Sequence, residues 1–253
     1  MAGIIFSYIY KSILFDTFPW LLIAAVVAGI FLGVIKTRKK TKTTINEGWI
    51  KRHDGGGFFQ HWGTAVGIFI LIISGILMGF LFMPHIFNTI SGFTFASNIH
   101  FTGLLITLFG GFYFLTGYLL SGKFKGMIPS IVDITRGTFG KYILRNKWIS
   151  EDKYLSSQKS SFLLFAFLGL IQLITGGIKV IAHIWSINPG FMAITNAIHD
   201  IFTLLFILVL IAHVLFVFLI KEHRVLLFSW FKGAVKEDYV RDHHPIWYEK
   251  LKK

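Results

Sequence analysis

Five long apolar stretches alternate with polar segments along this chain. A helix needs about 20 apolar residues to cross a hydrocarbon core roughly 30 Å thick, and the four later stretches have at least this length. The first stretch is the shortest, and Ile13–Phe18 would extend it. The apolar stretches are Trp20–Ile35, Gly63–Met83, Phe101–Leu120, Ser161–Ile184 and Ile194–Ile220. They predict five transmembrane helices, of which the second runs over Phe58–Met83 and the third over Ser97–Leu120.

The basic residues lie in the polar segments and indicate how these helices are oriented. The 253-residue chain has a formal net charge of +13, but 23 of its 25 basic residues fall in the segments 36–52, 123–159 and 221–253. Lys11 and Lys179 are the exceptions. Five spans place all three segments on one side, which the positive-inside rule makes the cytoplasmic side. We therefore expect the N-terminus outside and the C-terminus inside, and the charge does not indicate nucleic-acid binding.

Composition supports the membrane class and limits the cofactors. Hydrophobic residues make up 54% of the chain and charged residues only 15%, with a mean hydropathy of +0.67, which is unusual for a soluble domain. The chain contains no cysteine. It therefore cannot itself ligate an iron–sulfur cluster through cysteine or attach haem covalently as c-type cytochromes do. Any iron–sulfur relay would belong to a partner.

Four histidines lie in the predicted transmembrane helices and pair by membrane depth. His199 and His213 are 14 residues apart, which on one helix is about 21 Å along the axis and about 40° in bearing. In the five-span topology His61 is near the inner start of its helix, and His100 is near the outer start of the next. This pairs His61 with His213 inside and His100 with His199 outside. Imidazole is a common axial ligand of haem iron, so the pattern predicts two bis-histidine b haems.

Two other interpretations of the histidines stay open. A transporter for protons or a transition metal would gather its ligands at one depth with carboxylates nearby, but the four later stretches hold only Asp200. A plain membrane anchor would use the histidines structurally. Asp200 adjoins His199 and is a candidate partner for a haem propionate. His243 and His244 are expected in a solvated tail.

Three of the stretches contain a small hydroxyl residue followed by glycine. Pairs of this kind include Ser74-Gly75, Thr116-Gly117 and Thr175-Gly176. Small residues let helices approach closely in lipid, so we interpret the pairs first as packing positions. Glycine would also let a flat macrocycle approach the backbone, which spacing alone does not test.

The chain resembles the di-haem cytochrome b (gamma) subunit of membrane-bound formate dehydrogenases, within a superfamily shared with hydrogenase and thiosulfate reductase cytochromes b. The resemblance covers roughly 52–248. It rests on ordered motifs, which are Arg52-His53 before His61-Trp62, Lys153-Tyr154 with Gln158-Lys159, Ile198-His199-Asp200 with His213, and His243-His244-Pro245-x-Trp247-Tyr248.

The resemblance implies an all-α integral membrane fold with a four-helix di-haem core, to which the first helix would be an addition. Residues 1–50 would form that helix and a basic link, 51–225 the core, and 226–253 a cytoplasmic tail. It also implies haem ligands at the same four histidines as the depth argument, and a multi-pass protein of the inner membrane.

The resemblance further implies that an extracytoplasmic iron–sulfur and catalytic partner exchanges electrons with the outer haem. The inner haem would reduce a quinone, with menaquinone expected, near the cytoplasmic face. Hydrogenase or another molybdenum oxidoreductase is the alternative partner. The cofactor-binding residues implied beside the histidines are Arg52, Lys153, Tyr154 and Gln158.

Two positions depart from the family pattern. The family usually has an arginine three or four residues before the first ligand, where this chain has Gly57 and Phe58. Arg52 and Lys51 are the candidate substitutes as the partner of a propionate. The residue after the Lys-Tyr pair is usually asparagine, and here it is Leu155. This second departure bears on the quinone site.

Overall fold

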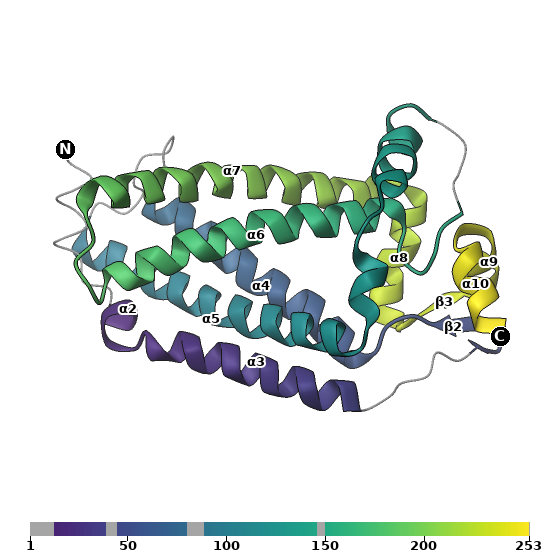
Figure 1. Cartoon of the computed structure of the whole chain (residues 1–253), viewed down its shortest axis with the longest axis horizontal. Helices are drawn as coiled ribbons and strands as arrows, with labels where there is room; N and C mark the ends of the chain where they lie inside the picture. The colour runs from purple at the N-terminus through teal and green to yellow at the C-terminus, as the bar shows by residue number, and fades with distance from the viewer. Residues whose placement is uncertain (1–12, 39–44, 80–88, 146–149, 253) are drawn as a thin grey trace. The chain divides into compact units, whose positions relative to one another are not determined.

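The computed structural model describes residues 13–38, 45–79, 89–145 and 150–252 (Figure 1). Five of its helices are long and apolar enough to span a membrane, which confirms the five stretches expected from the sequence. The expected end of the second stretch at Met83 lies outside the described residues. These helices are α3 (Trp20–Arg38), α4 (Gly55–Met78), α5 (Ile90–Leu120), α6 (Ser156–Ala182) and α7 (Pro189–Leu219).

Shorter elements precede, connect and follow the long helices. The helices are α2 (Ile13–Thr17), η1 (Lys123–Met127), η2 (Asp133–Gly140), α8 (Lys221–Lys232), α9 (Glu237–His243) and α10 (Pro245–Lys252). Three strands, β1 (Ile45–Asn46), β2 (Trp49–Lys51) and β3 (Ala234–Lys236), form an antiparallel sheet in the order β1-β2-β3. The helical fold is thus as expected, and the small sheet is an addition to it.

Helix α5 begins earlier than its apolar stretch. Thr89 caps its first turn, because its Oγ1 accepts a hydrogen bond from the N–H of Gly92 at 3.1 Å. The sequence predicted this helix only from Ser97 onward, since its first turns contain polar residues such as Ser91. Capping chemistry sets this end of the helix rather than hydrophobicity.

The chain forms two compact units, and each long helix from α4 to α7 contributes to both. Unit 1 comprises Met1–Gly33, Phe59–Thr116 and Leu168–Leu208. Its helices approach closely at glycines: a Cβ on Gly29 would lie 2.5 Å from the carbonyl oxygen of Phe109. A Cβ on Gly67 would overlap with Thr107 Oγ1. Any larger residue would push these helices apart, as expected for packing in lipid.

Unit 2 comprises Val34–Phe58, Gly117–Phe167 and Val209–Lys253. In its sheet, Ile50 of β2 pairs with Val235 of β3. A hydrophobic core forms around this pair from Ile50, Leu155, Leu226, Val235, Val240, Trp247 and Tyr248. The expected solvated tail is therefore wrong: the last residues fold into α8, β3, α9 and α10, because their scattered apolar side chains bury against β2.

Candidate functional site

His100 of α5 and His199 of α7 lie in unit 1, and each ring is held by a hydroxyl from another helix. His100 Nδ1 is 2.9 Å from Ser74 Oγ of α4. His199 Nδ1 is 2.8 Å from Thr175 Oγ1 of α6. The structure thus repeats one arrangement in two successive helix pairs.

The hydrogen bonds around the two hydroxyls determine the tautomer of each imidazole. Ser74 donates its single proton to the carbonyl oxygen of Ile70 at 2.6 Å, and Thr175 donates to that of Ile171 at 2.8 Å. Each hydroxyl must then accept the Nδ1–H of its histidine. The lone pair of each ring therefore resides on Nε2, which is the nitrogen that a metal would use, and the outer bond fixes the ring as in known metal sites.

The glycine after each hydroxyl lies beside the imidazole. A Cβ on Gly75 would be 3.9 Å from His100 Cε1, and one on Gly176 would be 3.6 Å from His199 Cε1. Cε1 adjoins Nε2, so a side chain at either position would occupy space beside the ligating nitrogen. Because both positions are glycine, a planar group can approach the two rings there. The two imidazoles and this space together fit a haem.

The third hydroxyl–glycine pair has a different role. Thr116 contacts α3, because a Cβ on Gly33 would lie 2.7 Å from its Cβ. Packing thus describes Thr116, whereas Ser74 and Thr175 additionally hold histidines. The three pairs look alike in sequence, and the structure separates one packing position from two that orient an imidazole.

The backbone at His199 is also anchored. Gln172 Nε2 of α6 donates to the carbonyl oxygen of His199 at 2.9 Å, and Thr203 Oγ1 donates to the same oxygen at 2.8 Å. His100 and His199 lie close enough for an electrostatic interaction. The structure therefore places both histidines in unit 1 and holds the α7 member at ring and backbone, and their pairing on one haem stays a prediction.

The other two histidines belong to different units. His61 of α4 lies in unit 1, with its ring edge-on to Trp62 at a centroid distance of 5.1 Å. His213 of α7 lies in unit 2, edge-on to Phe165 at 5.6 Å. Their pairing stays a prediction.

Unit 2 assembles the four other predicted site residues around a buried guanidinium. Arg52 is only 4% exposed, and its Nη2 donates to the carbonyl oxygen of Lys153 at 2.7 Å and to Gln158 Oε1 at 3.4 Å. The guanidinium also lies 6.0 Å from the ring centroid of Tyr154 and 5.5 Å from that of Trp247. Its Nε and Nη1 are buried and have no hydrogen-bond partner among the described residues.

Arg52, Lys153, Tyr154, Gln158 and Trp247 form a group that we call the Arg52 cluster. It contains a second basic side chain, Lys153, whose charge depends on pH. Burial, and secondly the charge of Arg52, lower the pKa of Lys153 to about 8. Burial raises the pKa of Tyr154, whose hydroxyl lies 2.8 Å from that of Tyr118. Leu155 is fully buried in the hydrophobic core, and its N–H donates to Gln158 Oε1 at 3.0 Å. The leucine side chain therefore offers no hydrogen bond where the family pattern has asparagine.

His244 joins this cluster, although the sequence assigned it to the tail. It is 0% exposed, and because the carbonyl oxygen of Asp152 can only accept, its Nδ1–H donates there at 2.6 Å. Nε2 is buried and has no partner among the described residues. Burial and then the charge of Arg52 lower the pKa of His244 to about 3, so the ring is a neutral acceptor. The apolar residues Val240 and Trp247, which are seven positions apart in the sequence, could have indicated that this segment is folded.

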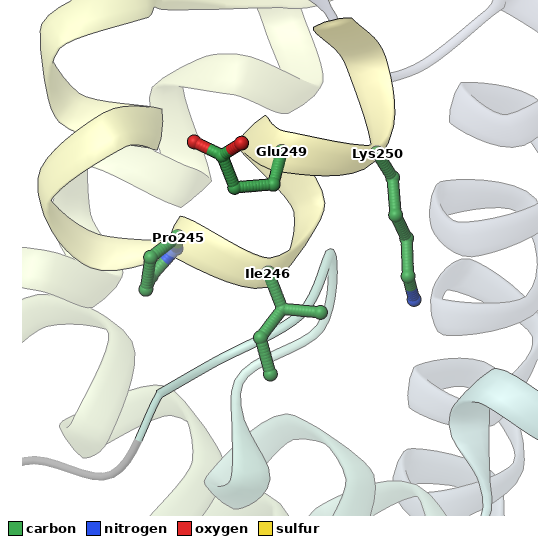
Figure 2. Close-up of a pocket in the computed structure, with 4 residues that line it drawn as sticks. All are labelled: Pro245, Ile246, Glu249 and Lys250. Carbon is green, nitrogen blue, oxygen red and sulfur yellow. The ribbon is translucent and has the colours of Figure 1, made fainter. Parts of the chain in front are cut away.

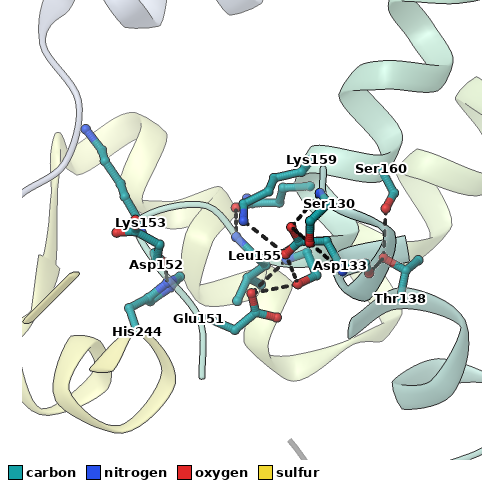
Figure 3. A network of polar contacts seen from close by, with 12 residues as sticks. Ser130, Asp133, Thr138, Glu151, Asp152, Lys153, Leu155, Lys159, Ser160 and His244 are labelled. Atoms are coloured by element: carbon teal, nitrogen blue, oxygen red, sulfur yellow. Dashed lines mark hydrogen bonds and ion pairs between the residues drawn. The ribbon is translucent and has the colours of Figure 1, made fainter. Parts of the chain in front are cut away.

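A network of carboxylates and hydroxyls lies beside the cluster in unit 2 (Figure 3). Ser156 Oγ is 2.7 Å from Asp133 Oδ1 and 2.9 Å from Glu151 Oε2. Burial raises the pKa of Glu151. Burial would also raise the pKa of Asp133, but hydrogen bonds from Ser130, Ser156 and Lys159 hold it at about 2. The network can thus hold one ionised carboxylate next to one that takes up protons more readily.

Two further features lie outside these sites. A shallow depression on α10 is lined by Pro245, Ile246, Glu249 and Lys250 (Figure 2), and it shares none of these residues with the histidine pair or the Arg52 cluster. In the described part of the chain, no three histidine, aspartate or glutamate side chains gather as a metal site would need.

Comparison with known proteins identifies one family. A family model described as "Prokaryotic cytochrome b561" matches residues 52–229, which include all four candidate histidines and all of α4 to α7. No curated protein matches the chain.

Proposed function

The chain belongs to the prokaryotic cytochrome b561 family, within the hydrogenase and formate dehydrogenase cytochrome b superfamily, and from this we propose the following role. It is the membrane subunit that links an extracytoplasmic oxidoreductase to the quinone pool through two b haems. The family makes the chain a multi-pass membrane haem protein of electron transfer. The observation that carries the proposal is the His100–His199 pair, with both Nε2 atoms left for iron.

His100 and His199 would hold the outer haem, and His61 and His213 the inner one. Haem b supplies one-electron redox chemistry. Two imidazoles on each iron leave no open coordination position, which favours electron transfer over substrate activation. Ser74 and Thr175 orient the outer ligands, so their rings need little rearrangement to ligate.

The Arg52 cluster is the proposed site for an oxygen-bearing ligand. A buried guanidinium with two unsatisfied nitrogens is costly, and a quinone carbonyl or a haem propionate would accept from them. Arg52, Lys153, Tyr154 and Gln158 would bind menaquinone at the cytoplasmic face inferred from the basic segments. His244 adds a neutral acceptor suited to the hydroxyl of the reduced quinone.

The proposed donor is a formate dehydrogenase type of catalytic and iron–sulfur partner. Because this chain has no cysteine, the iron–sulfur relay lies in that partner. Hydrogenase or another molybdenum oxidoreductase is the second candidate, supported by the superfamily to which the chain belongs.

The proposal is tested by the reduced-minus-oxidised optical spectrum of the purified chain, with haem counted per polypeptide. We expect two non-covalent low-spin b haems. Replacing His100 or His199 by alanine should remove one of them. His183→Gln is the matched control, since His183 bonds to Asp16 at 2.7 Å and is not a proposed ligand. Properly folded protein without haem would refute the proposal.

A further inference from the structure

One basic side chain in unit 1 is not explained by the basic segments. Lys179 lies in α6, outside those segments. Among the described residues of unit 1 it is the only lysine or arginine. Asp16 and Asp200 are the acidic residues of the same set, and Asp16 is bonded to His183. A cation within a transmembrane helix is costly and therefore marks a functional candidate.

Lys179 lies on the face of α6 that holds His199. It follows Thr175 by four residues, about one turn and about 6 Å along the axis, so the two side chains are neighbours. Thr175 accepts the Nδ1–H of His199. The charge of Lys179 acts on the imidazoles of His100 and His199 and on the carboxylate of Asp200. The ammonium therefore lies near the histidine pair.

Two simpler accounts of Lys179 do not fit these contacts. No ion pair of Lys179 occurs among the described residues, so a structural ion pair there does not account for it. Helix α6 ends at Ala182, and lysines near a helix end often extend to the membrane surface. A lysine that only extended outward would not act on two imidazoles and on Asp200 together.

The chemistry that Lys179 fits is a carboxylate. A haem b carries two propionates, and Asp200 would add a third carboxylate beside His199. Like charges in a poorly solvated site need a cation, and Lys179 is the one that the described part of unit 1 provides. We propose that Lys179 binds a propionate of the haem held by His100 and His199 and thereby raises the reduction potential of that haem. This inference rests on the proposed function.

The expected effect follows from the charge change at the iron. Reduction adds an electron, so a nearby positive charge favours the ferrous state, and its removal favours the ferric state. Lys179→Met keeps the length of the side chain and removes the charge. The equilibrium constant for reducing one haem should then fall about tenfold, which is about 59 mV for one electron. Lys179→Arg keeps the charge and should restore most of the difference.

The experiment is a potentiometric titration of the purified full chain, followed in the optical spectrum so that both haems are resolved. Lys125→Met is the matched control, because it removes one charge from an exposed lysine of η1. We expect one potential to fall in Lys179→Met, the other to stay, and both to stay in the control. Loss of one haem in Lys179→Met but not in Lys179→Arg would support the same charge requirement.

Two results overturn the inference but not the proposed function: two haems with unchanged potentials in Lys179→Met, or loss of one haem in both Lys179 variants. Wild-type protein without haem would instead overturn the proposed function.

A second measurement tests the propionate itself. The chain is reconstituted with haem dimethyl ester, which lacks the carboxylates, and the effect of Lys179→Met is measured again. The potential difference between wild type and variant should shrink with the ester. An equal difference with both haems would show that Lys179 acts without binding a propionate.

Discussion

Units 1 and 2 differ in how many polar partners surround their buried polar side chains. The histidine pair of unit 1 has few polar neighbours: each imidazole is held by one hydroxyl, the His100 ring also has a backbone hydrogen bond to Leu71, and each ring keeps one nitrogen with a lone pair. The Arg52 cluster of unit 2 is dense, with cations, tyrosines and a histidine packed around one guanidinium. Apolar surroundings suit a pair of neutral ligands, whereas a site for a polar ligand needs several donors held by a local hydrophobic core.

The difference indicates that two different kinds of packing hold the side chains of the two sites in place. Helix contacts through small residues such as Gly67 and Gly29 set the positions of the unit 1 side chains. In unit 2 the core of Ile50, Val235 and Trp247 holds the segment that carries His244. Variants in one unit should therefore spare the function of the other, which is open to direct test.

The largest effect is expected from the core of unit 2. Trp247→Ala removes a side chain that is 5% exposed, and such a truncation costs about 3–5 kcal/mol. Thermal unfolding and limited proteolysis should show that 226–252 loosens, while the spectrum of the haem at His100 and His199 persists. Trp185→Ala, at a residue that is 67% exposed, is the control. Loss of both haems in Trp247→Ala would contradict the independence of the two sites.

The next effect concerns the orientation of His199. Thr175→Val keeps the shape of the side chain and removes the acceptor of Nδ1–H, and loss of such a partner lowers metal affinity about 10–100-fold. Haem retention during dilution and transfer to apomyoglobin measures this. Thr116→Val is the control, because Thr116 packs on Gly33. Equal haem loss in both variants would mean that helix packing, not the hydrogen bond, holds the ligand.

The pH dependence of quinone binding tests whether the charge of Lys153 contributes to the site in unit 2. The pKa of Lys153 is lowered to about 8, so its positive charge is present below pH 8 and is lost as the pH rises through that value. Quinone affinity that depends on this charge should fall up to tenfold between pH 8 and 9. In Lys153→Arg the positive charge persists, so quinone affinity should not fall between pH 8 and 9. Unchanged profiles of KM for quinone would remove Lys153 from the site.

The smallest effect concerns the carboxylate network. Hydrogen bonds hold the pKa of Asp133 at about 2, below the ordinary value of about 3.9. The ionised form therefore adds stability above pH 4, and this contribution is lost as the pH falls toward 2. Asp133→Asn should lower the free energy of unfolding by about 1 kcal/mol at pH 7, and the difference should shrink as the pH falls through about 2 and disappear below it. A difference that is independent of pH would assign the effect to packing.

Several parts of the fold and the site were accessible from the sequence. The lengths of the apolar stretches predicted α3 to α7, since crossing a bilayer demands a long apolar helix. The start of α5 was missed because polar capping residues, not hydrophobic ones, define it. The folded segment around His244 was missed because it depends on the pairing of Val235 with Ile50, and these two residues are far apart in the sequence.

The sequence by itself determined the membrane class and the five helices, because these follow from length and hydrophobicity. Only the tertiary structure decided which atoms surround each histidine. Ser74, Thr116 and Thr175 stand in the same local pattern, yet two bond to imidazoles and one packs on α3. A side chain's partner depends on which helix faces it, and helix packing is a property of the folded chain.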